Sequence, residues 1–196
     1  MRKSREEAAQ TRQRILETAA FEFRRTGING TGLADLMGAA GLTNGGFYRH
    51  FDSKDDLVKE SFAVAADSAT AWIERFVKAR PGIAGILAAV DDYLSVSNRD
   101  SDACCPFVTL GCEVARGSEA VRDAATTAFM KQVEVISAHL PGRSPAAAKK
   151  EALALMSTMI GAMTVARMVS HRELSASILT QARKDLRRQL QEKRGR

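Results

Sequence analysis

The chain has 196 residues, of which 45% are hydrophobic and 27% charged, a composition that indicates one or two globular domains and excludes a largely disordered protein. No apolar run approaches the ~18–20 residues that a membrane span needs, and no apolar segment follows the basic N-terminus as it would in a secretory signal, so we expect a cytoplasmic protein with no membrane partner. The formal net charge is +6 at pH 7, which suits an anionic partner.

Basic residues gather at the two ends of the chain. Residues 1–14 hold five Lys or Arg against two Glu, a net charge of +3, and residues 183–196 hold seven against two acidic residues, a net charge of +5. A basic N-terminal arm is typical of a protein that binds a polyanion. The C-terminal cluster is better explained as a solvated chain end.

The first predicted helix covers about residues 11–26. Ile15, Ala19 and Phe23 repeat at intervals of four residues and form one apolar stripe. Gly27 follows as a stop, because glycine adopts the left-handed conformation in which many helices end. This segment therefore predicts a helix that packs one face against a core.

A helix-turn-helix is predicted next. Thr31 is placed to N-cap a second helix, which ends at Gly41, and Thr43 is placed to N-cap a short third helix over residues 44–50. We expect the first helix to provide the third wall of this small core.

The rest of the chain is helical by pattern. An S-x-x-D motif at Ser53 has the spacing of a capping box and opens a long helix over residues 54–79. Further helical patterns cover residues 83–97, 106–115, 119–139, 145–170 and 173–192. No segment shows the alternation of a strand, so the predicted fold is all-α.

The segment GLTNGGFYRHFDSKDDL is unusual because Gly45 and Gly46 stand where the third helix starts. A helix that enters the major groove of DNA brings its backbone close to phosphates, and glycines remove the side chains that would hold it off. Thr43, Tyr48 and His50 offer hydrogen-bond donors at phosphate reach. The segment therefore predicts a DNA-contacting helix.

Two aromatic residues flank these polar positions. Each glycine lowers helix stability by ~1 kcal/mol, so we expect the rings of Phe47 and Phe51 to point inward and to hold the short helix on the core. Three-helix packings with a tight turn also occur without a DNA partner, in which case Tyr48 and His50 would be ordinary surface residues.

Residues 11–58, TRQRILETAAFEFRRTGINGTGLADLMGAAGLTNGGFYRHFDSKDDLV, resemble the DNA-binding domain of the TetR/AcrR family of bacterial transcriptional regulators. The shared motifs are G-F-Y-R-H-F, S-K-D-D-L and the A-A-G turn that ends at Gly41. The resemblance and the pattern above together indicate contacts with DNA by Thr31, Thr43, Asn44, Gly45, Gly46, Tyr48, His50 and Lys54. Asn44 departs from the Lys or Arg of many members, and its amide suits a paired contact with adenine.

The resemblance also implies the domain organisation. Residues 1–53 would form the helix-turn-helix domain, and residues 54–196 a helical effector-binding and dimerisation domain. The segment MIGAMTVARMVSHRELSASILTQARKDL looks like the last two helices, through which family members form homodimers. The interface residues expected here are Leu153, Met156, Ile160, Met163, Thr164, Met168, Leu174, Ile178, Leu179, Ala182, Leu186 and Leu190. A two-fold dimer predicts a palindromic operator in double-stranded DNA.

Family members bind an inducer in the larger domain. The candidates for a pocket that takes an unknown small molecule are Trp72, Phe76, Tyr93, Cys105, Phe107, Cys112, Phe129, Met163 and Arg167. The apolar members of this set are otherwise explained as plain core. Arg167 lies on an apolar helix and needs a carboxylate, solvent or an anionic ligand.

Three cysteines, Cys104, Cys105 and Cys112, crowd into nine residues, and this odd number is not a disulfide framework. The first two precede Pro106, the expected first residue of a helix, where a thiol has a lowered pKa. They are either electrophile or redox sensors or small buried side chains. No histidine has the spacing for a zinc site with them, and we expect neither a metal nor another cofactor.

Three functions are compatible with these features. The first is a dimeric DNA-binding transcriptional regulator, a repressor released from its operator by a small-molecule or thiol-reactive effector. The second is a DNA-binding protein without an effector. The third, a cysteine-dependent enzyme, is disfavoured because no histidine pairs identifiably with the thiols. The effector, the operator, and the choice between repressor and activator remain open.

Overall fold

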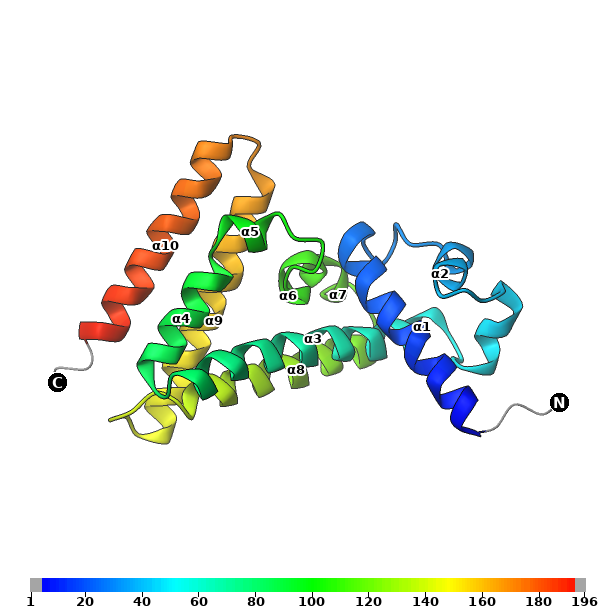
Figure 1. The fold of residues 1–196 in the computed structure, drawn as a ribbon, viewed down its shortest axis with the longest axis horizontal. Coiled ribbons are helices and arrows are strands. Elements are labelled where there is room, and N and C mark those ends of the chain that lie inside the picture. Colours follow the sequence, from blue (N-terminus) through cyan, green and yellow to red (C-terminus); the bar gives the residue numbers. More distant parts are fainter. Residues whose placement is uncertain (1–4, 193–196) are drawn as a thin grey trace.

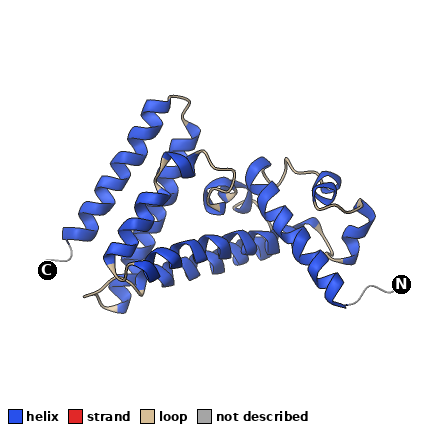
Figure 2. Ribbon diagram, viewed as in Figure 1, coloured by secondary structure: helices blue, strands red, loops and turns tan. Residues whose placement is uncertain are grey.

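The computed structural model describes residues 5–192, and all regular elements within them are helices (Figure 1; Figure 2). In chain order they are α1 (Arg5–Thr26), α2 (Leu33–Ala39), the 3-10 helix η1 (Asn44–Arg49), α3 (Lys54–Ala79), α4 (Ile83–Tyr93), α5 (Val96–Arg99), α6 (Pro106–Thr109), α7 (Gly111–Val114), α8 (Glu119–Ser137), α9 (Pro145–Met168) and α10 (Arg172–Glu192). The all-α prediction is confirmed. The basic residues Arg2, Lys3, Lys193, Arg194 and Arg196 lie outside the described residues.

The molecule is elongated, with the helix-turn-helix at one end and α10 at the other (Figure 1). The long helix α3 runs between the two ends with α8 packed along its side. The helices α4, α9 and α10 stand across the far end of α3, where α9 and α10 form an antiparallel pair. The short helices α6 and α7 lie next to α1, so the larger domain reaches the helix-turn-helix at this point.

Helix α1 already includes Arg5, the first residue that the structure describes, whereas the predicted start lay near Thr11. Its first turns carry no apolar stripe, and the pattern starts only where burial starts, at Thr11. Glu6 and Glu7 stabilise the extra turns because acidic side chains oppose the positive end of the helix dipole.

Two predicted helices are each divided in the structure. The segment 106–115 breaks at Leu110 into α6 and α7, and the segment 83–97 breaks at Leu94 into α4 and α5. In both cases the buried leucine lies at the break, so tertiary packing overrides a continuous helical pattern.

Two glycines end helices as predicted. Gly27 follows α1 with a φ of +84°, and Gly41 follows α2 with a φ of +69°. The amide of Gly27 donates to the carbonyl of Phe23 at 2.8 Å. Both glycines occupy the left-handed region, which side chains with a Cβ adopt only at a cost.

The core of the small domain confirms the predicted role of the two phenylalanines. Phe47 and Phe51 are 0% and 2% exposed, and their rings stack with centroids 5.6 Å apart. Burying a Phe side chain stabilises by about 1.5–3 kcal/mol, which offsets the ~1 kcal/mol that each glycine costs. Packing therefore holds the glycine-rich segment in place.

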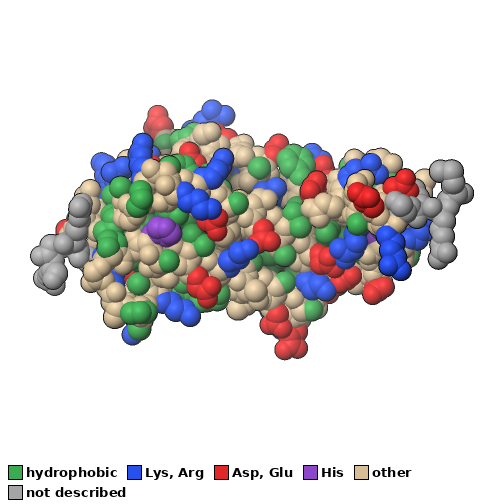
Figure 3. All heavy atoms as spheres, turned by 60° about the horizontal axis from the view of Figure 1, so that its bottom comes forward, with side chains coloured by type: hydrophobic (Ala, Val, Ile, Leu, Met, Phe, Trp, Pro, Cys, Tyr) green, Lys and Arg blue, Asp and Glu red, His purple; other side chains and the backbone are tan. Residues whose placement is uncertain are grey.

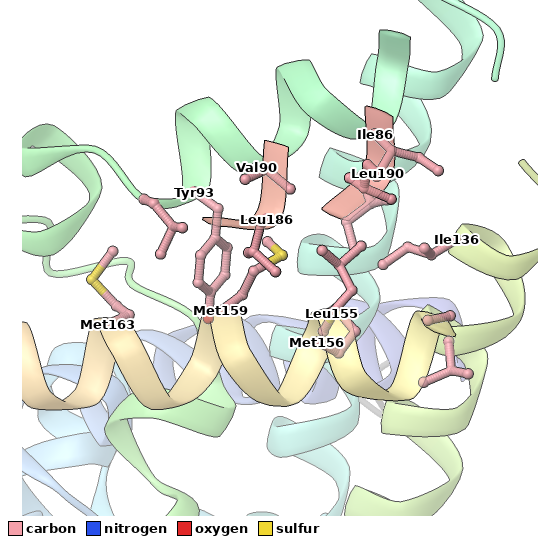
Figure 4. Packing of buried hydrophobic residues seen from close by; sticks show 14 of the residues in the cluster. Ile86, Val90, Tyr93, Ile136, Leu155, Met156, Met159, Met163, Leu186 and Leu190 are labelled. Carbon is pink, nitrogen blue, oxygen red and sulfur yellow. The ribbon is translucent and has the colours of Figure 1, made fainter. Parts of the chain in front are cut away.

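The core of the larger domain is built around α9 (Figure 4). The ring of Tyr93 points from α4 toward α9, where Met159 and Met163 lie along the facing surface. The dimer-interface prediction is wrong for five residues of α9 and α10. Each is only 0–2% exposed in the single chain and belongs to this core: Met156, Met163, Leu179, Leu186 and Leu190. The two helices meet each other through these side chains, so one protomer already covers that face.

The two cores share α3. The first half of the helix packs with the helix-turn-helix through Leu57 and Phe62, and the second half packs with the larger core through Ile73 and Val77. The boundary proposed after residue 53 falls at the start of this shared helix. A rigid α3 therefore connects the two domains mechanically.

Candidate DNA-binding surface and effector pocket

The third helix of the small domain is the 3-10 helix η1, not the predicted α-helix over residues 44–50. Its bonds span three residues, as in Gly46 N to Thr43 O at 3.0 Å and His50 N to Phe47 O at 2.9 Å. Thr43 occupies the N-cap position, but its hydroxyl makes no capping hydrogen bond. Two glycines in a short segment weaken α-helix formation, and short helices readily adopt the tighter form.

The outer surface of η1 is open to a partner. Tyr48 is 72% exposed and rests edge-on against Phe47, with ring centroids 5.1 Å apart. Thr43, Asn44 and Gly45 are also exposed. A Cβ added at Gly45 would meet nothing within 4 Å, so packing inside the chain does not require a glycine there.

The structure contradicts the predicted cap at Thr31. The N-cap of α2 is Gly32. Thr31 is only 6% exposed, and its hydroxyl donates to the carbonyl of Gly27 at 2.6 Å and lies 2.7 Å from the hydroxyl of Thr26. Its side chain stabilises the turn between α1 and α2, so we remove Thr31 from the expected DNA contacts.

Lys54 also stabilises this turn. Its ammonium donates to the carbonyls of Ile28 and Thr31 at 2.7 and 2.8 Å. Two of its three donors are thus used inside the chain. The resemblance assigned this lysine to a phosphate, and the structure gives it a role in holding the helix-turn-helix together.

A carboxylate from the larger domain binds the same turn. Glu113 of α7 accepts hydrogen bonds from the backbone amides of Ile28 at 3.0 Å and Asn29 at 2.9 Å. Glu113 was not among the predicted residues, because no local pattern relates it to residues more than 80 positions away. These bonds connect the larger domain to the helix-turn-helix.

Arg12 fixes the other end of η1. Its guanidinium donates to the carbonyl of His50 at 3.3 Å and to Glu60 at 2.6 Å, and it lies over the ring of Phe51, 4.6 Å from the centroid. This arginine of the basic arm therefore holds the end of η1 in place. His50 itself is half-buried.

Basic side chains do not form a continuous surface over the whole molecule. Figure 3 shows one long face on which Lys and Arg alternate with Asp and Glu. Such a mixed face has no long-range attraction for a polyanion. This face therefore offers no extended basic surface for DNA.

Three of the predicted pocket residues, Trp72, Tyr93 and Cys105, line one pocket of about 320 Å³. The complete lining is Arg24, Ser68, Ala69, Trp72, Arg75, Tyr93, Asn98, Ala103, Cys105 and Pro106. Phe76 lies behind the indole of Trp72, with ring centroids 5.1 Å apart. The volume is within the range of small-molecule sites.

The other predicted pocket residues lie elsewhere. Phe107 packs between Phe62 and Phe129 where the two cores meet. Met163 is fully buried in the core, and Cys112 is exposed on α7. The resemblance to the family suggested that these residues line one pocket, but the break at Leu110 and the packing of α8 separate their side chains.

Arg167 faces backbone carbonyls rather than a carboxylate. Its guanidinium donates to the carbonyls of Arg99 and Ser101. It borders a separate, polar pocket of about 370 Å³ near the junction of α9 and α10. Arg167 therefore fixes the loop after α5 and does not reach the pocket at Trp72.

The predicted lowering of the cysteine pKa values is wrong. Burial raises the pKa of Cys104 and Cys105 above the usual thiol value. Desolvation is the largest cause, because apolar surroundings disfavour the charged thiolate. A raised pKa lowers the thiolate fraction at a given pH.

The described residues include no cluster of three or more His, Cys, Asp or Glu side chains that could hold a metal ion. Nor does any helix among them have the length and apolar character to cross a membrane.

Two family models match the chain. Residues 15–61 match bacterial regulatory proteins of the tetR family, and residues 82–184 match the C-terminal domain of LmrA/YxaF-like transcriptional regulators. The first match covers the helix-turn-helix and the start of α3. The second covers the region from α4 to α10.

Curated relatives match the N-terminal part. The transcriptional regulator AcrR of Shigella flexneri is 44% identical over 59 residues, which are 30% of this chain and 27% of that protein. The regulator TtgR of Pseudomonas putida is 42% identical over 59 residues, 30% of this chain and 28% of that protein. The match spans little more than a quarter of each relative. Both relatives are named as transcriptional regulators.

Solved structures match almost the whole chain. A TetR regulator from Chloroflexus aurantiacus superposes with a TM-score of 0.75 at 26% identity and covers 92% of this chain and 94% of its own. The reduced form of NemR from E. coli superposes with a TM-score of 0.76 at 20% identity, covering 90% and 95%. The latter similarity is one of fold.

Proposed function

The chain belongs to the TetR family of bacterial transcriptional regulators, and from this membership we propose that it is a homodimeric repressor, released from a palindromic operator when a small molecule binds the larger domain. The observation that carries the proposal is the exposed surface of η1, anchored from beneath by Phe47 and connected to the larger domain through α3 and Glu113. A surface of this kind meets DNA, and the connection allows an effector to move it.

The DNA contacts we propose are those that the structure leaves accessible. Thr43, Asn44 and Tyr48 are exposed, and Gly45 lets the backbone approach. Phosphate contacts by hydroxyl and backbone donors set the register of the helix, and Asn44 has the geometry to read adenine.

A second copy of the chain would cover apolar side chains that remain exposed at the α9 and α10 end. Val165, Met168 and Leu174 are 43%, 76% and 50% exposed. The partly buried residues Leu153, Ile160 and Ile178 belong to the same two helices. Exposed apolar clusters of this kind favour association, and a two-fold dimer would present two copies of η1 to a palindrome.

The effector we propose binds without forming a covalent bond. Cys104 and Cys105 are buried, and burial raises the pKa of each, which opposes attack by the thiolate. Cys112 is exposed and gives the thiol-reactive alternative a specific residue. A Cys112→Ser variant that keeps its response to effector would exclude this alternative.

The test is binding of the purified protein to labelled DNA from the region flanking its own gene, followed by fluorescence anisotropy. We expect saturable binding that a scrambled duplex does not compete, with two chains per palindrome by light scattering. Specific binding that candidate small molecules never weaken would favour a DNA-binding protein without an effector. No specific binding at any salt concentration would refute the proposal for this DNA.

A further inference from the structure

The pocket at Trp72 contains an arginine without a counter-charge. Arg24 of α1 is half-buried, and its guanidinium donates to the carbonyls of Ala20 at 2.7 Å and Ala103 at 3.0 Å. It forms no ion pair with any carboxylate of the described residues, and burial lowers its pKa. A partly desolvated cation bound only to neutral carbonyls is poorly compensated. An anion in the pocket would supply the missing charge.

A second polar group in the pocket has only a weak partner. Tyr93 is 6% exposed, and its hydroxyl makes no hydrogen bond of standard geometry within the described chain. Its polar neighbour is the thiol of Cys105, a weak acceptor. A ligand oxygen that reached this hydroxyl would be a stronger acceptor than the thiol.

Part of the remaining wall is flat and apolar. The rings of Trp72 and Tyr93 lie with centroids 6.1 Å apart at 55°, and Ala69 and Pro106 border the same space. The indole nitrogen donates to Asp92 at 3.1 Å, which fixes the ring. Asp92 does not line the pocket. Aromatic walls of this kind favour a planar aromatic ligand.

We infer that this pocket binds a planar aromatic molecule bearing an anionic group, with the anion at Arg24, an oxygen at Tyr93 and the ring against Trp72. Arg75, a second arginine of the lining without an ion pair in the described chain, adds to the positive potential at the pocket. Such a molecule would be the chemical class of the proposed effector. Its binding to the pocket does not depend on the proposed function, but the release of DNA by it does.

The position of Arg24 connects binding to the DNA-binding domain. Arg24 belongs to α1, whose other residues build the core beneath η1, and it contacts the loop that carries Ala103. A ligand anion would compete with the carbonyl of Ala103 for the guanidinium. Binding would therefore change a contact between the two domains directly.

The protein contains its own probe for this site, because Trp72 is the single tryptophan of the chain. The probes are 4-nitrobenzoate and its neutral counterpart 4-nitrobenzyl alcohol, both of which quench indole fluorescence on contact. We expect saturable quenching by the anion and about 10-fold or weaker binding of the alcohol. Titration of free N-acetyltryptophanamide corrects for absorbance. Equal affinity for the two probes, or no saturable quenching by the anion, would overturn the inference.

Matched arginine variants localise the anion. Arg24→Met should weaken binding of 4-nitrobenzoate about 10-fold or more while leaving the alcohol unchanged, and Tyr93→Phe should weaken it less. The control is Arg25→Met, which removes the neighbouring exposed charge that pairs with Glu22 and should change affinity less than two-fold. Circular dichroism melting confirms folding, and Arg24→Gln replaces the methionine variant if that one is unstable. Unchanged affinity in the folded Arg24 variant would overturn the inference.

Anisotropy of bound operator separates the two proposals. Quenching that saturates without release of DNA would support the ligand class and refute its role as effector. Release of DNA by 4-nitrobenzoate with no change at Trp72 would place the effector elsewhere and refute the pocket. Release that follows the quenching curve would support both.

Discussion

Lys54 and Glu113 bind the same turn between α1 and α2, Lys54 through backbone carbonyls and Glu113 through backbone amides. Lys54 donates to the carbonyls of Ile28 and Thr31, and Glu113 accepts from the amides of Ile28 and Asn29. One residue begins α3, and the other lies in α7 of the larger domain. The turn between α1 and α2 is therefore held from both domains.

Removing the carboxylate of Glu113 should destabilise the protein. Glu113→Ala loses two charge-assisted hydrogen bonds, and we expect a loss of about 1–3 kcal/mol in the free energy of unfolding. The measurement is urea denaturation followed by circular dichroism. Glu134→Ala is the control, because Glu134 is an exposed residue with no ion pair in the described chain. Equal effects of the two substitutions would contradict the role of Glu113.

Two glycines of the helix-turn-helix should respond to alanine in opposite directions. Gly41 has a φ of +69°, so Gly41→Ala should destabilise by about 1–2 kcal/mol although the space around it is open. Gly38 lies inside α2 with no atom near its added Cβ, so Gly38→Ala should stabilise by about 0.5–1 kcal/mol. Thermal melting of both variants tests this pair. The same sign for both would show that backbone conformation does not decide these positions.

Tyr48 and Gly45 should affect DNA binding rather than stability. Tyr48→Ala is expected to weaken operator binding about 10-fold, and Gly45→Val to weaken it further because the added side chain holds the backbone off. Tyr48 is exposed and the space around Gly45 is open in the free protein, so the melting temperatures of both variants should change little. Arg49→Ala, at a neighbouring exposed residue of η1, is the variant with which the effect of Tyr48→Ala is compared. Loss of DNA binding that follows loss of folding would contradict the prediction.

Stability should fall above about pH 9. Burial raises the pKa of Cys104, Cys105 and Tyr93, so the unfolded chain releases these protons at a lower pH than the folded one. The stabilisation from these three neutral groups is fully present below their pKa values in the unfolded chain, roughly 8.5 for Cys and 10 for Tyr. It is lost as the pH rises through their pKa values in the folded protein.

Urea midpoints at pH 7, 9 and 10 measure this loss. A variant with Tyr93→Phe and Cys105→Ala should show a smaller decrease between pH 7 and 10 than the parent chain. A decrease of the same size in both proteins would mean that other groups, such as surface lysines, cause the alkaline instability.

Local physics alone allowed much of the fold to be predicted. The apolar repeats of α1, α8, α9 and α10, and the glycines that end α1 and α2, are properties of adjacent residues, and the sequence determined them. The inward positions of Phe47 and Phe51 followed from the same reasoning, because a glycine-rich segment holds its place only by packing. The DNA-binding role rested on a motif contained in one short stretch.

Contacts between distant segments were decided only by the tertiary structure. Packing placed Thr31 inside the turn and turned Lys54 inward. It also brought Arg24 of α1 to a pocket otherwise formed by the larger domain, although no periodicity in the chain indicated this neighbour.

Burial likewise reversed the expected chemistry of Cys104 and Cys105. The reason is physical, because desolvation and partner choice depend on what surrounds a group in three dimensions, whereas helix formation depends largely on the residues next to it along the chain. The sequence thus determined the helices and the helix-turn-helix motif, and the tertiary structure decided which charged side chains face a pocket, a turn or the core.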